Sequence, residues 1–383
     1  MVDLGVIMRG EGARYVMTHR TIFQQRKAIR DIADCRTAAM GSVTNTCQDC
    51  SGPYRLHRSC RNRSCPLCQG EKRRDWLEAR RQELLAASYL QMVFANPKEF
   101  RVLARYCPAE LYGILFRAAG QAVIDVGRFE LHAQLGCLGQ FQTWTQLMAS
   151  HAHTHFLVPC GGFSEDGSRW ISFEPKDFPS QALRRRFRTL LCKYVRAAAR
   201  QGKFDGLPAT VSVDRLVAKV QRRELSVYVA PPFGGPEKLL QYLSQYMYRV
   251  AITNDRIESY DRDQVTFRWR DYRDGGRVRR FTIKPAEFVG RFLPHLPPKG
   301  FVRARSFGFL GNRNRKQSIE KARQLIGQAP TSSVQVRPRP VRLCPSCHVA
   351  RGHKGAPHFA PPPEVIPQLV LPLRSPPITP VAA

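Results

Sequence analysis

The sequence predicts an α+β protein with a metal-binding module near its amino terminus and a low-complexity tail at its carboxyl terminus. Helical and strand patterns alternate without the regular strand–helix–strand rhythm of a parallel α/β fold. Two CxxC pairs lie between residues 47 and 68. Beyond Gly327, proline, serine and glutamine dominate and apolar periodicity is weak, which is typical of disorder.

The composition points to a polyanionic partner. The chain has 383 residues, enough for two or three domains and a substantial core. It holds 61 lysine and arginine residues against 30 acidic residues, a formal net charge of +31, which suits nucleic acid. A membrane surface would attract this charge too, but no apolar run approaches about 18 residues and residues 1–12 lack a signal-peptide core. We therefore expect a cytoplasmic protein.

The cysteine spacing favours zinc over disulfides. Twelve cysteines would suit a disulfide scaffold in a short secreted chain, but this chain is long and its cysteines recur two residues apart. Two such knuckles can bring four sulfurs together in one tetrahedral zinc site. The predicted ligands are Cys47, Cys50, Cys65 and Cys68. Cys60 and Cys35 lie nearby, and each is open to either ligation or a small buried role.

Basic side chains surround these cysteines and recur later in the chain. Arg61 and Arg63 flank the second knuckle, where a zinc-stapled loop would present a rigid surface to phosphates. A solvated charged face is the simpler interpretation. Residues 180–201 predict a basic helix suited to tracking a phosphate backbone. Its candidate DNA contacts are Arg184, Arg185 and Arg188.

Periodicity and turn signals place the remaining elements. Helices are predicted at 13–40, 72–87, 98–127, 180–201, 214–220, 285–293 and 313–325. Strands are predicted at 90–94, 151–158, 225–229, 264–272 and 277–283, the last two as a hairpin around a Gly-Gly turn, and the segment 136–144 leads into the strand that begins at residue 151.

Three histidines alternate within an apolar, β-prone run. Because successive side chains of a strand point to opposite faces, His151, His153 and His155 would share one face. Imidazoles in that arrangement can chelate a divalent ion. A strand edge with solvated histidines is the simpler interpretation, but three of the ten histidines within five residues favour a metal site.

A tyrosine pair follows on a predicted helix. A turn at Phe233-Gly234-Gly235 and a proline at the next position mark the helix start. Tyr242 and Tyr246 are four residues apart and share a face, whereas Tyr248 points away. Two phenols on one face can act as nucleophiles, although core aromatics packed on a sheet would give the same pattern.

A His-x-His strand followed by tyrosines four apart resembles the HUH endonucleases, specifically the two-tyrosine rolling-circle transposases of bacterial insertion sequences. The resemblance covers roughly residues 15–326. Its motifs, in chain order, are Cys35-Arg36-Thr37-Ala38-Ala39, the Ser59 to Gln69 cysteine segment, the Phe163 to Trp170 turn, the Pro231 to Glu237 turn and Pro298 to Arg303. Thr154 stands where the family usually has a hydrophobic residue, and family members often have histidine at the position of Tyr248.

The resemblance implies a fold and a reaction. The fold would be an antiparallel sheet with His153 and His155 on a central strand and helices packed on one face. A Mg²⁺ or Mn²⁺ ion would be held by these histidines, with His151 as the third ligand. Tyr242 or Tyr246 would attack single-stranded DNA at the element ends and leave a 5′-phosphotyrosine.

The implied organisation has three parts. Residues 1–95 would form a helical, structural-zinc DNA-recognition domain, 96–326 the tyrosine nuclease, and 327–383 the disordered tail. The protein would act near the nucleoid on DNA, with neither a membrane nor a small-molecule substrate as partner.

Two other functions stay open at this point, as does the role of the tail. A plasmid or phage rolling-circle replication initiator shares the same chemistry, and Thr154 leaves room for a catalytically inactive, zinc-dependent DNA-binding protein. In the tail, Cys344 and Cys347 form one more CxxC. This pair can belong to a small zinc knuckle with nearby histidines or to an incomplete site.

Overall fold

The structure, a computed structural model, describes residues 2–47, 50–230, 250–328, 344 and 347. The α-helices among them are α1 (Leu4–Thr18), α2 (Phe23–Asp34), α3 (Pro66–Arg81), α4 (Arg101–Tyr106), α5 (Pro108–Glu130), α6 (Ser180–Arg200), α7 (Val213–Gln221), α9 (Pro285–Phe292) and α10 (Arg315–Ile326). The strands are β1 (Ser42–Thr46), β2 (Pro53–His57), β3 (Tyr89–Ala95), β4 (Gly136–Trp144), β5 (Ser150–Pro159), β6 (Gly161–Phe163), β7 (Trp170–Ser172), β8 (Val227–Val229), β9 (Ile257–Tyr260), β10 (Val265–Asp271), β11 (Arg277–Ile283) and β12 (Ala304–Gly308).

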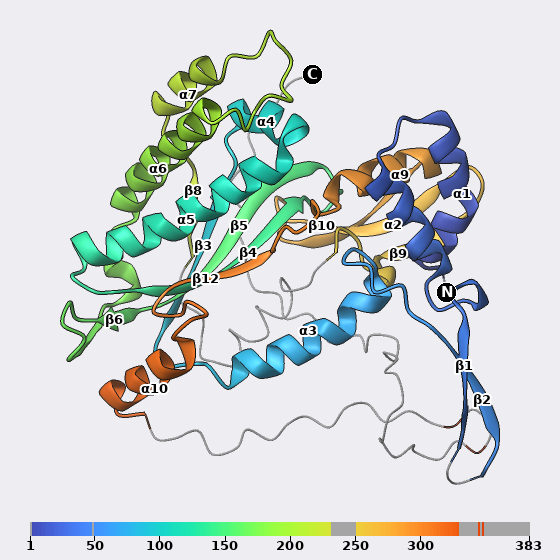
Figure 1. The fold of residues 1–383 in the computed structure, drawn as a ribbon, viewed down its shortest axis with the longest axis horizontal. Helices are drawn as coiled ribbons and strands as arrows, with labels where there is room; N and C mark the ends of the chain where they lie inside the picture. The colour runs from blue at the N-terminus through green and yellow to red at the C-terminus, as the bar shows by residue number, and fades with distance from the viewer. Residues whose placement is uncertain (1, 48–49, 231–249, 329–343, 345–346, 348–383) are drawn as a thin grey trace.

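A five-stranded sheet forms the centre of the molecule. Its strand order is β12-β4-β5-β3-β8, and every neighbouring pair is antiparallel. The histidine strand β5 therefore lies in the middle. Helices α4 to α7 gather on one side of this sheet (Figure 1). The expected antiparallel sheet with helices on one face is confirmed.

Aromatic side chains fix the helices to the sheet. Phe94 of β3 packs edge-on against Phe156 of β5 at 5.5 Å between ring centroids and against Phe187 of α6 at 4.9 Å. Phe116 of α5 meets Phe156 at 5.6 Å. A Cβ added to Gly139 would lie 2.7 Å from both the Phe116 and Phe156 rings, so this close approach requires glycine. One face of the sheet is thus covered by a tightly packed aromatic layer.

A second core lies beside the first and joins the amino-terminal helices to residues 251–293. Helices α1 and α2 pack with α9 and the β9-β10-β11 sheet, burying Ile7, Ile29, Phe267 and Phe288. Figure 1 shows this body at one end of the central sheet. The predicted hairpin is present as β10 and β11, paired from Val265↔Ile283 onward. The amino-terminal helices therefore rest on elements more than 200 residues away in sequence.

Several local features differ from the sequence prediction. The single helix predicted for 13–40 is two helices, because the backbone at His19 is extended and ends α1. The helix predicted for 98–127 is likewise divided into α4 and α5, because α4 ends at Cys107 and Pro108 begins α5. The strand that ends at Ala95 pairs with β5 and so contributes to the central sheet from within the predicted zinc domain. The boundary at residue 95 stays a prediction.

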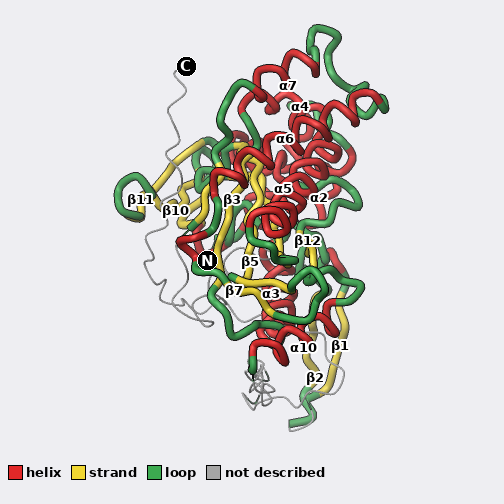
Figure 2. Tube along the Cα trace, turned by 90° about the vertical axis from the view of Figure 1, so that its left-hand side faces the viewer, coloured by secondary structure: helices red, strands yellow, loops and turns green. Residues whose placement is uncertain are grey.

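The hairpin of β1 and β2 was not predicted. Its strands pair from Ser42↔His57 to Thr46↔Pro53, and none of their residues is buried. It extends away from the sheets and helices (Figure 1), and the perpendicular view in Figure 2 again places it at the lower end of the molecule.

Within the described ranges, no helix is long and apolar enough to cross a bilayer.

Candidate active site and metal centres

The three histidines share the face of β5 opposite the packed helices. The ring centroids of His151 and His153 are 5.0 Å apart, and those of His153 and His155 are 4.8 Å apart. Ala152 and Thr154 alternate with them and are buried on the other face. The alternation expected from the sequence is therefore confirmed, and it gathers three imidazoles on one surface.

Hydrogen bonds orient two of these rings. The Nδ1 atom of His153 lies 2.8 Å from the carbonyl oxygen of His151, which favours a proton on Nδ1 and a lone pair on Nε2. The amide of Gln91 lies 3.2 Å from Nδ1 of His155. The contacting atom is the amide nitrogen Nε2, so Gln91 donates and Nδ1 of His155 accepts. A histidine that ligates a metal ordinarily donates its second N–H as His153 does here, so Nε2 of His153 fits a divalent ion.

Glutamines extend this polar face across the sheet, and the sequence reasoning missed them. Gln142 and Gln140 of β4 stand directly opposite His153 and His155. They are only 3% and 5% exposed, and Gln91 is 2% exposed. Their alternation in Gly136–Trp144 repeats that of the histidines. That pattern could have identified them as part of the same surface.

The remaining features of this site bear on metal binding and on the tyrosines. Burial, followed by the charge of Arg101, lowers the pKa of His151, which favours the neutral, ligating imidazole. Among the described residues, two groups of at least three donor side chains have all their donor atoms within 4.8 Å of one another, and both consist of cysteines. The donor atoms of the three histidines are therefore farther apart than the sulfurs in those groups. Tyr242, Tyr246 and Tyr248 lie outside the described residues.

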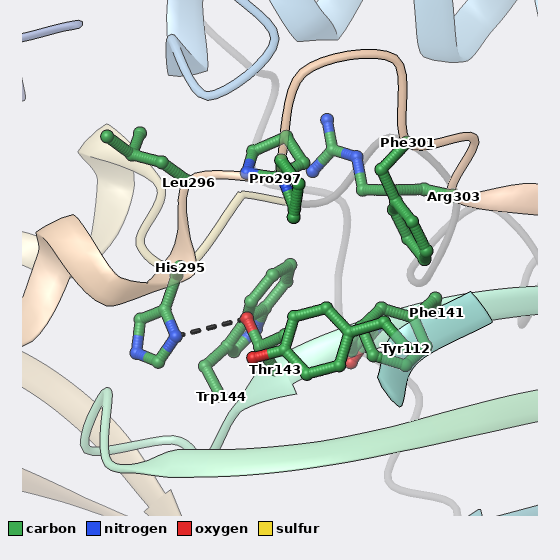
Figure 3. Close-up of a pocket in the computed structure, with 11 residues that line it drawn as sticks. Tyr112, Phe141, Thr143, Trp144, His295, Leu296, Pro297, Phe301 and Arg303 are labelled. Carbon is green, nitrogen blue, oxygen red and sulfur yellow. Dashed lines mark hydrogen bonds between the residues drawn. The ribbon is translucent and has the colours of Figure 1, made fainter. Parts of the chain in front are cut away.

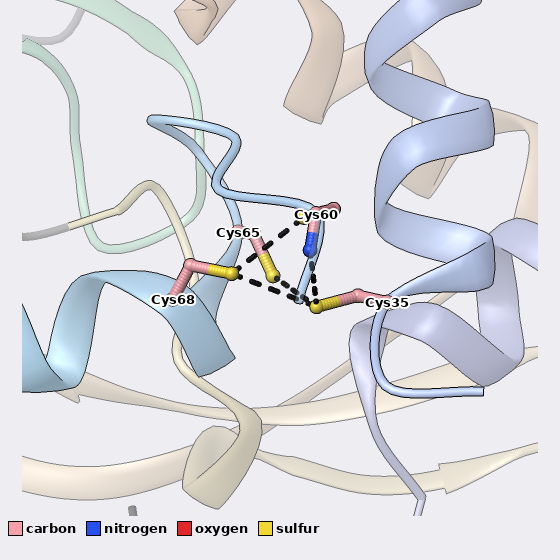
Figure 4. A group of neighbouring side chains, drawn as sticks. All are labelled: Cys35, Cys60, Cys65 and Cys68. Atoms are coloured by element: carbon pink, nitrogen blue, oxygen red, sulfur yellow. Dashed lines mark hydrogen bonds between the residues drawn. The ribbon is translucent and has the colours of Figure 1, made fainter. Parts of the chain in front are cut away.

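The first cysteine group lies where α2, the segment after β2, and the start of α3 meet (Figure 4). Its members are Cys35, Cys60, Cys65 and Cys68. The sulfur of Cys35 lies 3.6 Å from those of Cys65 and Cys68, and Cys60 lies 3.6 Å from Cys68. Four sulfurs bound tetrahedrally at about 2.3 Å from zinc are about 3.8 Å apart, whereas a disulfide needs about 2.0 Å. These residues therefore fit a structural zinc ion.

The surroundings of this group also suit thiolates. The backbone N–H groups of Cys60 and Asn62 point at the sulfurs of Cys35 and Cys60, at 3.5 and 3.4 Å. Hydrogen bonds from the other thiols, that of Cys35 first, hold the pKa of Cys68 far below its ordinary value, while the same contacts raise the pKa of Cys65. Hydrogen bonds, that from Cys60 first, lower the pKa of Cys35 as well, and ionising all four thiols at this spacing requires a cation.

The predicted zinc set was wrong in its membership. Cys65 and Cys68 are joined by Cys35 and Cys60, not by Cys47 and Cys50. The reason is the hairpin of 42–57, because antiparallel pairing brings the residues that flank it together, as the hydrogen bond from Arg36 N–H to the Arg58 carbonyl shows. The tip of that hairpin lies about 17 Å from its base at about 3.4 Å per residue.

The hairpin tip holds the second cysteine group. Cys47 and Cys50 lie there, and the tail cysteines Cys344 and Cys347 complete the group. The sulfurs of Cys47 and Cys347 are 3.8 Å apart, as are those of Cys50 and Cys344. All four donor atoms lie within 4.8 Å of one another.

The candidate DNA-binding arginines fall into different environments. Arg61 is exposed beside the first cysteine group. Arg63 donates to the carbonyl oxygen of Pro298 at 2.8 Å and also to that of Phe301, and burial lowers its pKa. The guanidinium of Arg63 thus joins the zinc module to the segment that leads into β12.

The arginines of α6 share one surface. Arg184, Arg185 and Arg188 line a single open hollow together with Glu224. Arg184 pairs with Glu224 at 3.4 Å, and Arg188 donates to the carbonyl oxygen of Arg223 at 2.8 Å. Arg185 is exposed. This hollow lies beside β8, because Arg184 also donates to the carbonyl of Val227.

A small, mostly apolar pocket lies between β4 and the segment after α9 (Figure 3). There the hydroxyl of Thr143 lies 3.1 Å from Nδ1 of the buried His295, whose Nε2 lies 2.9 Å from the carbonyl oxygen of Met148. Burial lowers the pKa of His295 to about 4. A neutral imidazole that donates from Nε2 satisfies both contacts, so His295 acts as a structural link.

Comparisons with known proteins agree with this architecture. A family described as "Putative transposase" matches residues 136–318, and one described as "Transposase zinc-binding domain" matches residues 7–96. "Putative transposase y4qJ" of Sinorhizobium fredii (strain NBRC 101917 / NGR234) is 37% identical over 369 residues, 90% of this chain and 93% of its own. "Transposase for insertion sequence element IS801" of Pseudomonas savastanoi pv. phaseolicola is 25% identical over 316 residues, 79% and 75% of the two chains.

A solved structure was also matched, that of the conjugative relaxase TrwC in complex with oriT DNA. It is 12% identical, covers 41% of this chain and 71% of its own, and has a TM-score of 0.23, a likeness too distant to support an inference. The two family matches and the relative at 37% identity decide the assignment. The chain belongs to the two-tyrosine, rolling-circle HUH transposases of insertion sequences, which carry an amino-terminal zinc-binding domain.

Proposed function

We propose that this protein cuts and rejoins single-stranded DNA at the ends of its element through a 5′-phosphotyrosine intermediate. The observation that carries the proposal is the row of imidazoles on the middle strand of an antiparallel sheet, in a chain of the rolling-circle transposase family. The histidine face carries buried amides and imidazoles, so it offers fixed polar groups to a phosphodiester.

His153 and His155 would hold a divalent ion, with His151 as a third ligand. Mg²⁺ or Mn²⁺ bound there would neutralise charge that develops on the scissile phosphate. Gln91 keeps His155 in place, and the carbonyl of His151 does the same for His153. Because these partners belong to the sheet, the ligand geometry is set before DNA binds.

The proposed nucleophiles are Tyr242 and Tyr246. The phenol oxygen attacks phosphorus, a P–O bond to tyrosine forms, and the bond from phosphorus to the 3′ oxygen of the preceding nucleotide breaks. The phenol loses one proton and the leaving 3′ oxygen gains one, so the transfer needs no external energy source. Free tyrosine has a pKa of about 10, so a nearby base or cation must assist its ionisation. A second tyrosine would serve the second strand transfer while the first holds its strand.

The proposed DNA surface includes Arg61 and the α6 arginines Arg184, Arg185 and Arg188. Arg61 and Arg185 are exposed, and the α6 arginines line one hollow. Such guanidinium groups bind phosphates without reading sequence. Arg63, also predicted from the sequence as a DNA contact, donates to the backbone carbonyls of Phe301 and Pro298.

The test uses the full-length protein and a 3′-labelled, single-stranded oligonucleotide that carries the element end. With Mn²⁺ or Mg²⁺, a covalent adduct should survive denaturing electrophoresis, and mass spectrometry should place the phosphate on Tyr242 or Tyr246. Each single Tyr→Phe variant should keep some cleavage yet block complete transposition, and the double variant should form no adduct. Tyr248→Phe is the matched control and should remain active.

His153→Ala separates chemistry from folding. It should abolish the adduct and leave the thermal midpoint and the affinity for DNA close to those of the unmodified protein. An adduct on Tyr248 or on a serine, or an adduct in the double variant, would overturn the assignment. Loss of DNA binding together with cleavage in His153→Ala would instead indicate a structural role for that histidine.

A further inference from the structure

The hairpin tip and the tail meet at a group of four cysteines. Cys50 and Cys344 are separated by 294 residues in sequence, yet their sulfurs lie 3.8 Å apart. Cys47 and Cys347 are at the same distance. The zinc-binding domain that the family comparison recognises ends at residue 96, so it does not include the tail cysteines.

The sulfur spacing fits one particular kind of ligand. Zinc bound tetrahedrally by four thiolates at about 2.3 Å holds them about 3.8 Å apart. A disulfide bond would need about 2.0 Å, so these distances describe unlinked sulfurs. Four soft sulfur donors in a tetrahedron select zinc over the hard ions that suit oxygen ligands.

Burial at the hairpin tip supports the same conclusion. The strands β1 and β2 have no buried residue, yet Cys47 is only 3% exposed and Cys344 is 0% exposed. Cys50 is exposed, which places the group at the surface with two of its members shielded. The tail cysteines therefore pack against the hairpin tip and shield it from solvent.

A cross-link at the tip would stabilise the hairpin. An isolated two-stranded hairpin is marginally stable in water, and this one extends away from both cores (Figure 1). The turn itself is held by the backbone bond from Cys47 N–H to the Gly52 carbonyl, at 3.0 Å, and by a left-handed Ser51 with φ of +54°. A metal ion would supply the missing cross-link.

We infer that Cys47, Cys50, Cys344 and Cys347 form a second structural zinc site, which fastens the carboxyl-terminal tail to the tip of the amino-terminal hairpin. The first site, built from Cys35, Cys60, Cys65 and Cys68, holds the base of the same hairpin. The two ions would thus brace it at both ends. This inference is independent of the proposed strand transfer.

Zinc stoichiometry tests the inference directly. Full-length protein, purified under reducing conditions, should contain two zinc ions per chain by elemental analysis. The double variant Cys344→Ser/Cys347→Ser should contain one, as should Cys47→Ser/Cys50→Ser. Combining all four substitutions should remove no further zinc, because both pairs serve one ion. Cys107→Ser, a half-buried cysteine outside both groups, is the matched control and should keep two.

A second measurement remains informative if a variant folds poorly. A site-specific protease sequence is inserted between residues 329 and 343 of the otherwise unmodified protein, and the chain is cut after folding. The tail fragment should co-elute with the body in the presence of zinc and separate after a chelator is added. Molar mass should correspond to one chain, which shows that the tail binds its own hairpin.

The outcomes are distinct. Two zinc ions in the tail variant, or a tail fragment that leaves the body while zinc is present, would overturn the inference. A dimer that falls apart with the chelator would overturn the intramolecular staple. Cobalt substitution gives an independent spectroscopic check, because the thiolate-to-cobalt absorption should fall by about half in either double variant, one of two S₄ sites being lost.

Discussion

Thr154 offers a sharp test of how the central sheet is built. It is 0% exposed on the helix-covered face, paired in register with Phe94 and Phe141, and its hydroxyl has no hydrogen-bond partner among the described residues. A buried, unsatisfied hydroxyl costs about 1–3 kcal/mol. Thr154→Val keeps the shape and removes that cost, so we expect the free energy of unfolding to rise by about 1 kcal/mol or more.

A matched threonine on the neighbouring strand should respond in the opposite way. Thr143 is 7% exposed, and its hydroxyl bonds to His295, so Thr143→Val should destabilise the protein by about 1–3 kcal/mol. Denaturant unfolding, followed by tryptophan fluorescence with zinc bound, compares the two variants. A change of about 1 kcal/mol moves the thermal midpoint by about 2–4 °C in a domain of about 150–250 residues. Equal destabilisation by both variants would refute the reasoning.

Three further predictions concern acid, zinc and salt. Burial lowers the pKa of His295 to about 4 in the folded protein. As the pH falls below about 6.5, this histidine therefore takes up a proton in the unfolded chain but stays neutral in the folded protein. The contribution of His295 to the free energy of unfolding should fall by about 2 kcal/mol between pH 7 and 5. His295→Gln should flatten that part of the pH profile, measured by denaturant unfolding. Cys65→Ser should lose the zinc of the first site and lower the thermal midpoint, measured alongside elemental analysis; an unchanged zinc content would contradict the ligand set. If the four proposed arginines each contact a phosphate, the affinity for single-stranded DNA should drop about 50-fold between 50 and 200 mM salt. Fluorescence anisotropy measures this affinity, and Arg185→Gln should make the slope of log affinity against log salt concentration shallower by about 0.7. A salt-independent affinity would exclude the electrostatic interpretation.

The sequence by itself determined the local elements between residues 150 and 283. Alternation predicted a strand through His151, His153 and His155, and the structure has that strand as β5. Turn residues predicted the β10–β11 hairpin, and helical periodicity predicted α6 and α7 close to their observed bounds. These features succeed because strand alternation, helix periodicity and turn chemistry depend on residues close together in the chain.

Tertiary structure decided which distant residues meet. Cys65 and Cys68 meet Cys35 and Cys60 because of an exposed hairpin whose strands show little apolar alternation. No periodic pattern in the sequence therefore predicted that hairpin. The meeting of the hairpin tip with Cys344 spans nearly the whole chain, and one CxxC in the tail carries no information about its partner. Knuckle spacing identifies the kind of ligand, and only the fold determines which knuckles share an ion.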